Sequence, residues 1–110
     1  MSLVVMGLSH RTSPLEVLER ASLDDDSTIR LRTALRGSEY LAESMLVATC
    51  NRLEVYAEAV TFHGAVDEIG AALSQASGVP RDELTPHLYV HYEDRAVAHT
   101  FSVACGLESM

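Results

Sequence analysis

The fold is decided by residues 44–59, SMLVATCNRLEVYAEA. Residues 44–48 are a short apolar run, which is typical of a buried strand. In residues 53–59, apolar side chains alternate with Glu54, Tyr56 and Glu58, and this period of two is typical of a half-exposed strand. Only residues 49–52 lie between the two runs, so the sequence predicts a hairpin. Asn51-Arg52 is a poor tight-turn pair, which favours a wider, shaped loop.

Apolar periodicity predicts the remaining elements, which are a strand at 3–8, helices at 14–21 and 24–36, a helix at 65–76, a strand at 87–92 and a helix at 94–105. Ser13-Pro14-Leu15-Glu16 has the form of a capping box before the first helix. The triplet Asp24-Asp25-Asp26 can cap the second helix, and Gly37 and Gly78 are helix stops. Metal binding by the triplet is the less favoured interpretation, because a capping loop needs no metal.

The order of these elements is strand, helix pair, strand, strand, helix, strand and a trailing helix. Without the trailing helix this is β-α-β-β-α-β, the split arrangement of ferredoxin-like domains. We therefore predict an α+β fold with the helices on one face of the sheet. The other face stays free for a site, a partner or the trailing C-terminal helix. A length of 110 residues allows one domain with one modest core.

Composition and charge exclude several classes of protein. The chain has 8 basic and 16 acidic side chains and a net charge of −8, which argues against a broad nucleic-acid-binding surface. No apolar run approaches the roughly 20 residues of a membrane helix, and the N-terminus does not resemble a signal peptide. We therefore expect a cytoplasmic protein without membrane contact. Two cysteines, Cys50 and Cys105, are too few for a disulfide scaffold and are expected to be reduced.

Cys50 is the first candidate for chemistry. A lone cysteine at the end of an apolar strand is most often a small core residue. Its place at the strand terminus and the nearby Arg52 favour a thiolate instead. A thiolate attacks acyl groups, and a guanidinium can hold a substrate carboxylate by two parallel hydrogen bonds. Cys105 lies with the apolar stripe of the last helix, and we interpret it as structural.

His99 is the second candidate. Val97, Phe101, Ala104 and Cys105 form one apolar stripe on the last helix, and His99 points away from it. Either His99 is exposed to solvent, or it exchanges protons with a site on that other side. His87 and His91 would share one face of a strand, but no nearby cysteine or carboxylate completes a metal site, so we assign no metal.

The polar segment between the first strand and the first helix, residues 7–14, gives a weaker signal. It has one glycine and no Gly-Lys-Ser/Thr ending, so it is unlike a phosphate-binding loop. From its spacing alone it is a helix-capping turn.

Three stretches together resemble the glutamyl-tRNA reductase family. They are residues 7–17, GLSHRTSPLEV, residues 48–56, ATCNRLEVY, and residues 99–110, HTFSVACGLESM. They occur in the order of the family and cover essentially the whole chain. The resemblance implies a ferredoxin-like N-terminal catalytic domain, which agrees with the order of elements above.

The resemblance also implies a function. The family reduces glutamyl-tRNA with NADPH to glutamate-1-semialdehyde, the first step of tetrapyrrole synthesis from glutamate. Cys50 matches the nucleophile that forms a thioester, and His99 matches a histidine important for activity. The positions that match substrate-binding residues are Thr49, Asn51, Arg52 and Ser109. The loop expected to line the same pocket contains Ser9, His10, Arg11 and Thr12.

The cofactor and the partners follow from the same resemblance. No Gly-x-Gly-x-x-Gly follows a strand here, so we expect NADPH to be bound by a domain that this chain lacks. The whole chain, residues 1–110, is then the glutamyl-tRNA-binding domain, and it is expected not to complete the reduction alone. The family forms homodimers through a C-terminal domain, and hand-over of the product to the next enzyme of the pathway is a further expectation.

Two other classes of function remain open. The chain can be a regulatory ferredoxin-like binding module in which Cys50 is buried and inert. It can also be a small redox protein that uses Cys50 and Cys105, although no Cys-x-x-Cys pair is present.

Overall fold

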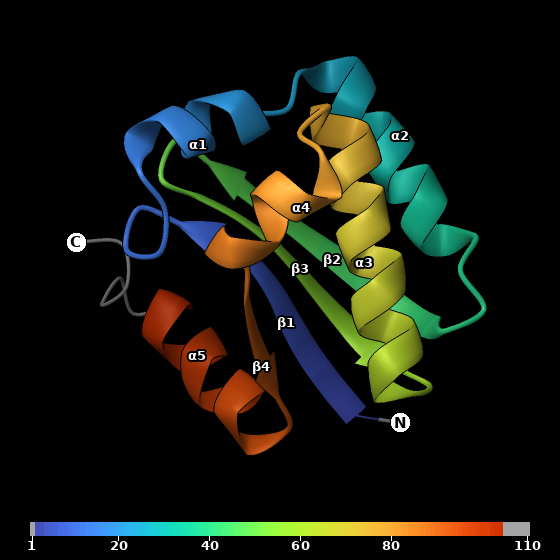
Figure 1. Cartoon of the computed structure of the whole chain (residues 1–110). Coiled ribbons are helices and arrows are strands. Elements are labelled where there is room, and N and C mark those ends of the chain that lie inside the picture. Colours follow the sequence, from blue (N-terminus) through green and yellow to red (C-terminus); the bar gives the residue numbers. More distant parts are fainter. Residues whose placement is uncertain (1, 105–110) are drawn as a thin grey trace.

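The sheet confirms the predicted split arrangement. In the computed structural model, which describes residues 2–104, four antiparallel strands pair in the order β2-β3-β1-β4 (Figure 1). They are β1 (Ser2–Ser9), β2 (Leu41–Thr49), β3 (Arg52–Ala59) and β4 (Tyr89–Tyr92). Because β3 lies between β1 and β2, the first strand–helix–strand unit is split by the strand that follows it.

The helices lie on both faces of this sheet. They are α1 (Leu15–Ala21), α2 (Asp25–Arg36), α3 (Phe62–Ser77), the short α4 (Arg81–Leu84) with the 3-10 turn η1 (Thr85–His87), and α5 (Asp94–Ala104). Side chains of α1 to α4 share one apolar core with the sheet, whereas Ala96 of α5 belongs to a separate cluster. The trailing helix, α5, therefore packs on the sheet face opposite α1 to α4, which is the face that the sequence analysis expected to be free of the other helices.

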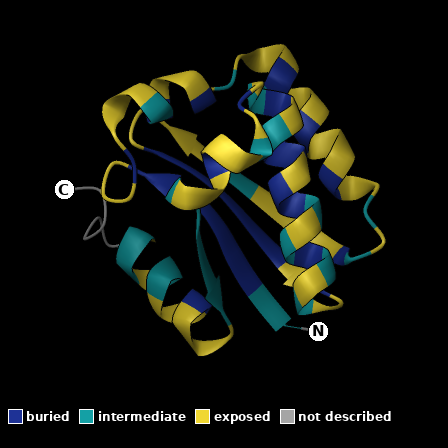
Figure 2. Ribbon diagram, viewed as in Figure 1, coloured by how far each residue is buried: buried dark blue, intermediate teal, exposed yellow. Residues whose placement is uncertain are grey.

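Alternation along the strands builds the two cores. Val4, Met6 and Leu8 of β1 point into the main core, while Val5 points to the other face and packs with Tyr56 and Ala96. Figure 2 shows β1 and β3 as largely buried. The prediction of a half-exposed β3 is therefore wrong, because α5 and β4 side chains cover the face that carries Glu54 and Tyr56.

The helix ends confirm some predicted caps and correct another. Asp24 caps α2, since its Oδ1 accepts a hydrogen bond of 2.7 Å from the Ser27 N–H. Gly78 ends α3 with a φ of +76°, a left-handed conformation that favours glycine. The capping box at Ser13 is wrong: α1 begins at Leu15, Pro14 takes the cap position, and no side chain caps the helix.

None of the helices within residues 2–104 combines the length and the apolar character that crossing a membrane requires.

Candidate functional site

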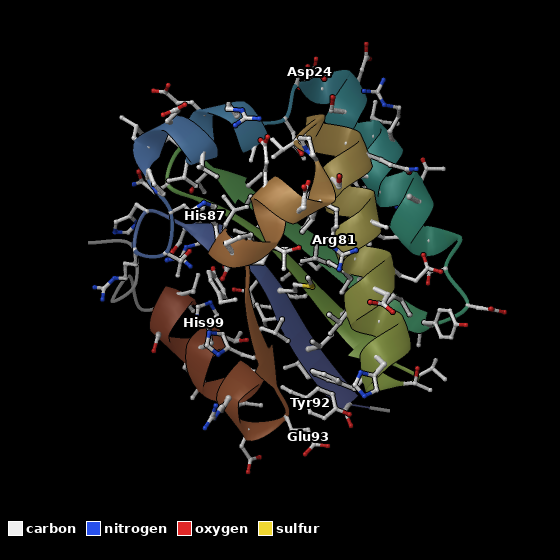
Figure 3. The ribbon with its side chains drawn as sticks, in the orientation of Figure 1. Asp24, Arg81, His87, Tyr92, Glu93 and His99 are labelled. Atoms are coloured by element: carbon white, nitrogen blue, oxygen red, sulfur yellow. The ribbon has the colours of Figure 1, made fainter. Side chains whose placement is uncertain are left out.

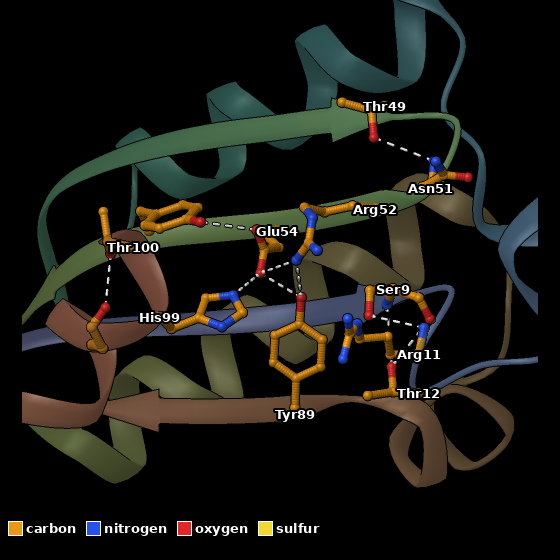
Figure 4. A network of polar contacts seen from close by, with 12 residues as sticks. Ser9, Arg11, Thr12, Thr49, Asn51, Arg52, Glu54, Tyr89, His99 and Thr100 are labelled. Atoms are coloured by element: carbon orange, nitrogen blue, oxygen red, sulfur yellow. Dashed lines mark hydrogen bonds and ion pairs between the residues drawn. The ribbon is translucent and has the colours of Figure 1, made fainter. Parts of the chain in front are cut away.

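The turn that carries Cys50 is tighter than predicted. Thr49 and Arg52 face each other in the register of β2 and β3, so only Cys50 and Asn51 form the turn. The Asn51 N–H donates a hydrogen bond of 3.2 Å to the Thr49 hydroxyl, which stabilises the turn without a glycine (Figure 4). Cys50 is exposed at this tip. The alternative of a buried cysteine is therefore wrong.

The loop after β1 lies against this turn. The His10 N–H donates a hydrogen bond of 2.9 Å to the carbonyl oxygen of Asn51. The loop is held by its own contacts, since the Ser9 N–H donates to the Thr12 hydroxyl over 3.1 Å and the Arg11 N–H to the Ser9 hydroxyl over 3.3 Å (Figure 4). The fold thus brings together two segments that the sequence singled out separately.

Cys50 lines a cavity of about 600 Å³ on the helical side of the turn. The walls come from α1 and the residues after it, within 15–23, and from the strand ends and turn within 48–53. The cavity has both polar and apolar lining, and Thr49 and Arg52 also contribute to it. A small acyl group presented at the turn has room beside the sulfur atom.

A buried polar cluster lies on the opposite face of β3, which we call the Glu54 cluster: Arg52, Glu54, Tyr56, Tyr89 and His99 (Figure 4). The side chains of Arg52 and Glu54 are 3% and 0% exposed, and Arg52 NH1 lies 3.1 Å from Glu54 Oε2. The Tyr56 hydroxyl donates a bond of 2.9 Å to Glu54 Oε1. The Tyr89 hydroxyl and His99 Nε2 both contact Glu54 Oε2. One carboxylate thus holds four partners.

His99 points from α5 into this cluster (Figure 3). The sequence correctly placed it away from the apolar stripe, but the stripe itself faces solvent. Val97 and Phe101 are 45% and 68% exposed, and Ala104 is exposed as well. The alternative of a solvent-exposed His99 is therefore wrong, because its side chain is 9% exposed and its ring contacts Glu54. Cys105 lies outside the described residues.

His87 and His91, which the sequence placed on one face of a strand, do not form a pair. His87 belongs to η1 and precedes β4, so it does not share a strand face with His91. His91 instead stacks on His99, with ring centroids 4.4 Å apart and an angle of 28° between the ring planes. Among residues 2–104 no group of three or more His, Cys, Asp or Glu side chains is arranged to hold a metal ion.

Glu54 is ionised although it is buried. Burial raises the pKa of this carboxyl group, but hydrogen bonds from Tyr89, His99 and Tyr56 and the charge of Arg52 outweigh it, so the pKa is lowered from its ordinary value of 4.5. Burial and then the hydrogen bond to Glu54 raise the pKa values of Tyr56 and Tyr89. Both phenols are therefore neutral donors to a carboxylate near pH 7.

This titration predicts a stability that depends on pH. Because the folded state lowers the pKa of Glu54, the stabilisation is complete above the ordinary value of 4.5 and is lost as the pH falls through the folded-state pKa. We expect the unfolding free energy, measured by urea denaturation, to fall below pH 4.5 more steeply in the parent chain than in Glu54→Gln. Equal slopes for the two proteins would contradict this account.

The sequence reading missed Glu54, Tyr56 and Tyr89 as site residues. A signal was available for Glu54, because Arg52 and Glu54 are two residues apart and so share one face of any strand. Tyr89 gave no local signal, since only the β1–β4 pairing brings it near β3. Arg52 joins the two parts of the site: it follows the Cys50 turn directly and its guanidinium reaches Glu54. Ser109 lies outside the described residues.

The described residues do not fit a dinucleotide cofactor. Binding of NADPH at a helix N-terminus requires a parallel strand, a glycine-rich turn and a helix. The strands of residues 2–104 are antiparallel, and the turn from β1 to α1 contains no glycine after Gly7. NADPH chemistry therefore cannot be assigned to this part of the chain.

Comparisons with known proteins agree with these motifs. The family model described as "Glutamyl-tRNAGlu reductase, N-terminal domain" matches residues 6–110. Proteins named glutamyl-tRNA reductase from Streptomyces coelicolor and Thermobifida fusca are 57% and 51% identical over the whole chain. The chain covers only 19% and 23% of these two relatives.

A solved structure gives the same result. The glutamyl-tRNA reductase from Methanopyrus kandleri is 33% identical, with a TM-score of 0.66 over 98% of this chain and 23% of that one. The fold of that structure is therefore shared over nearly the whole of this chain. The chain belongs to the glutamyl-tRNA reductase family and corresponds to the N-terminal domain of that family.

Proposed function

We propose that this domain takes the glutamyl group from glutamyl-tRNA as a thioester on Cys50, within an enzyme that makes glutamate-1-semialdehyde for tetrapyrrole synthesis. The observation that carries the proposal is the exposed sulfur atom at a rigid turn, beside a cavity of about 600 Å³. Family membership supports the substrate class. The thioester is useful chemically, because its carbonyl is more electrophilic than that of an ester and its leaving group is better.

In the proposed transfer step the glutamyl group passes from the ribose oxygen of the tRNA to the sulfur atom of Cys50. The Cys50 thiolate attacks the carbonyl carbon of the glutamyl ester, and a C–S bond forms. The C–O bond to the terminal ribose breaks, and the ribose oxygen takes up a proton as the tRNA leaves. No oxidant or reductant is needed for this step. Ionisation of the thiol releases one proton, and the departing ribose oxygen takes up one proton. A single acid–base group can therefore carry out both transfers.

The proposed roles of the other residues follow their positions. Thr49, Asn51 and Arg52 flank Cys50 in the sequence and are proposed to bind the glutamyl group, with Arg52 supplying positive charge for its carboxylate. Arg52 NH1 already contacts Glu54, so a substrate carboxylate would share this guanidinium. His99 is proposed to move the proton. Two further assignments rest on the family motif: Ser109 as a substrate-binding residue, and the pocket loop Ser9, His10, Arg11 and Thr12.

The rest of the activity is proposed for the longer protein. The relatives are about four to five times the length of this chain, which spans 19% to 26% of them. We propose that NADPH reduces the thioester and is held by residues other than 2–104. A homodimer, hand-over of the aldehyde to the next enzyme of the pathway, and a cytoplasmic location complete the proposal, in which residues 1–110 form the N-terminal catalytic domain.

Mass spectrometry of the intact chain tests the function. After the chain is mixed with glutamyl-tRNA and quenched in acid, we expect a glutamyl adduct that peptide mapping places on Cys50. Cys50→Ala should give no adduct, because the nucleophile is gone. Cys105→Ala is the matched control and should react like the parent.

Two results would overturn the assignment. One is an adduct that persists in Cys50→Ala, which would show that another side chain is the acceptor. The other is deacylation of glutamyl-tRNA at the same rate with the parent chain, with Cys50→Ala and without protein. Circular dichroism of the two variants shows whether they keep the parent fold.

A further inference from the structure

Glu54 contacts the ring of His99 at one defined nitrogen, Nε2. We propose that Glu54 is a positioning residue that fixes the tautomer and orientation of His99, so that Nδ1 is the ring atom that accepts and returns the proton during acyl transfer. This inference rests on the proposed function, because it concerns how the same site moves its proton.

The first support is the chemistry of the contact. An ionised carboxylate can only accept hydrogen bonds. Glu54 Oε2 faces His99 Nε2, so this nitrogen must donate and therefore carries a hydrogen. When the ring is neutral, its lone pair then lies on Nδ1. The carboxylate thus selects one of two tautomers, in the way that second partners orient a histidine in many active sites.

The second support is the rigidity of Glu54 itself. Its side chain is fully buried, and its neighbour across the sheet is Gly7. Tyr56 binds Oε1 over 2.9 Å, while Arg52 and Tyr89 bind Oε2. A carboxylate held at both oxygens cannot rotate freely. Its position is therefore set by contacts from β3 and β4, and His99 of α5 meets it there (Figure 4).

The groups that face His99 have different functions in this arrangement. From β3, Glu54 contacts Nε2, and Arg52 lies behind it. From β4, the Tyr89 ring lies 5.4 Å from the His99 ring, and His91 stacks on it at 4.4 Å. Stacking fixes the plane of the imidazole but does not distinguish its two nitrogens. The hydrogen bond to Glu54 makes that distinction, so loss of Glu54 and loss of His91 should have different consequences.

The tautomer is observable by NMR. In the uniformly ¹⁵N-labelled chain, two-bond ¹⁵N–¹H spectra of the imidazole rings, recorded across a pH titration, distinguish Nε2–H from Nδ1–H. We expect neutral His99 to be the Nε2–H tautomer. In Glu54→Gln the fraction of neutral His99 in the Nε2–H tautomer should fall, because an amide can either donate to Nε2 or accept from it. His91→Leu is the matched control and should keep the tautomer, and His63 on α3 serves as the internal reference.

Kinetics connects the tautomer to the reaction. At saturating glutamyl-tRNA, Glu54→Gln should form the Cys50 adduct at least about tenfold more slowly, a factor within the usual range of acid–base catalysis. The concentration of glutamyl-tRNA at half-saturation should stay unchanged. A merely structural role of Glu54 would change affinity and rate together and would leave the tautomer of His99 unchanged.

The outcomes separate this inference from the proposed function. An Nδ1–H tautomer in the parent chain overturns the inference, and this observation needs no variant. An unchanged tautomer fraction of His99 in Glu54→Gln overturns it as well. If the parent chain shows the Nε2–H tautomer but forms no adduct on Cys50, the proposed function fails while the positioning of His99 by Glu54 stands.

Discussion

Substitution of Glu54 by leucine is expected to lower the unfolding free energy at pH 7 by about 3 to 5 kcal/mol, the usual cost of removing one partner from a buried ion pair. Arg52 is 3% exposed and would keep its charge without the carboxylate beside it. The hydroxyl groups of Tyr56 and Tyr89 would lose their acceptor at the same time. Urea denaturation followed by circular dichroism measures the loss.

The companion variant tests the cause. Arg52→Met combined with Glu54→Leu removes both charges and replaces them with side chains of similar size, an exchange that is often neutral or stabilising. We expect the double variant to be more stable than Glu54→Leu alone. If the double variant is as unstable as the sum of the two single variants, the cost does not come from an uncompensated charge, and the ion pair is not what stabilises this face of the sheet.

Substitution of Gly7 by alanine is the second large effect, and we expect a loss of about 3 kcal/mol, at the upper end of the range for overpacking a core. Gly7 pairs with Glu54 across β1 and β3. A Cβ atom at this position would lie 2.8 Å from the Cα atom of Glu54 and still closer to the carbonyl oxygen of Leu53. These are backbone atoms of the central strands, so neither can move without breaking the β1–β3 pairing.

A matched substitution isolates the steric cause. Gly37 ends α2 with a φ of −81°, and the nearest atom to a Cβ there is the Thr33 carbonyl oxygen at 3.5 Å. Gly37→Ala should therefore be within about 0.5 kcal/mol of the parent, as is usual for surface substitutions. Thermal or urea unfolding of both variants makes the comparison. Equal losses for Gly7→Ala and Gly37→Ala would show that the close approach at Gly7 does not determine stability.

The sequence predicts the fold well because local patterns and long-range packing agree there. The strand at residues 53–59, the Asp24 cap and the Gly78 stop all have local physical causes, and the structure contains each of them, although β3 is buried on both faces. Ser13 is an exception: its pattern fits a cap, but Pro14 occupies the cap position when α1 begins at Leu15. A one-residue shift in a helix start cannot be read from a four-residue motif.

The site is less predictable because its parts meet only in three dimensions. The turn at Cys50 could be found from adjacent residues. The Glu54 cluster could not, since it depends on β1 bringing β3 and β4 to its two sides and on α5 crossing them. The orientation of α5 could not be decided for the same reason: an apolar stripe favours packing on an apolar surface, whereas the surface beneath α5 combines a small apolar cluster with the Glu54 carboxylate.

The inverted packing of α5 makes its attachment unlike that of the other helices. α3 is held by apolar contact with the main core, which proton concentration and ionic strength affect weakly. α5 contributes Ala96 to a small cluster, and its His99 binds the Glu54 carboxylate and stacks on His91. Protonation of Glu54 weakens its contact with His99, whereas the apolar contacts of α3 carry no charge that acid could remove. We therefore expect acid to release α5 from the sheet at a pH at which the helices on the other face are still packed, and hydrogen exchange of the two helical layers would measure this difference.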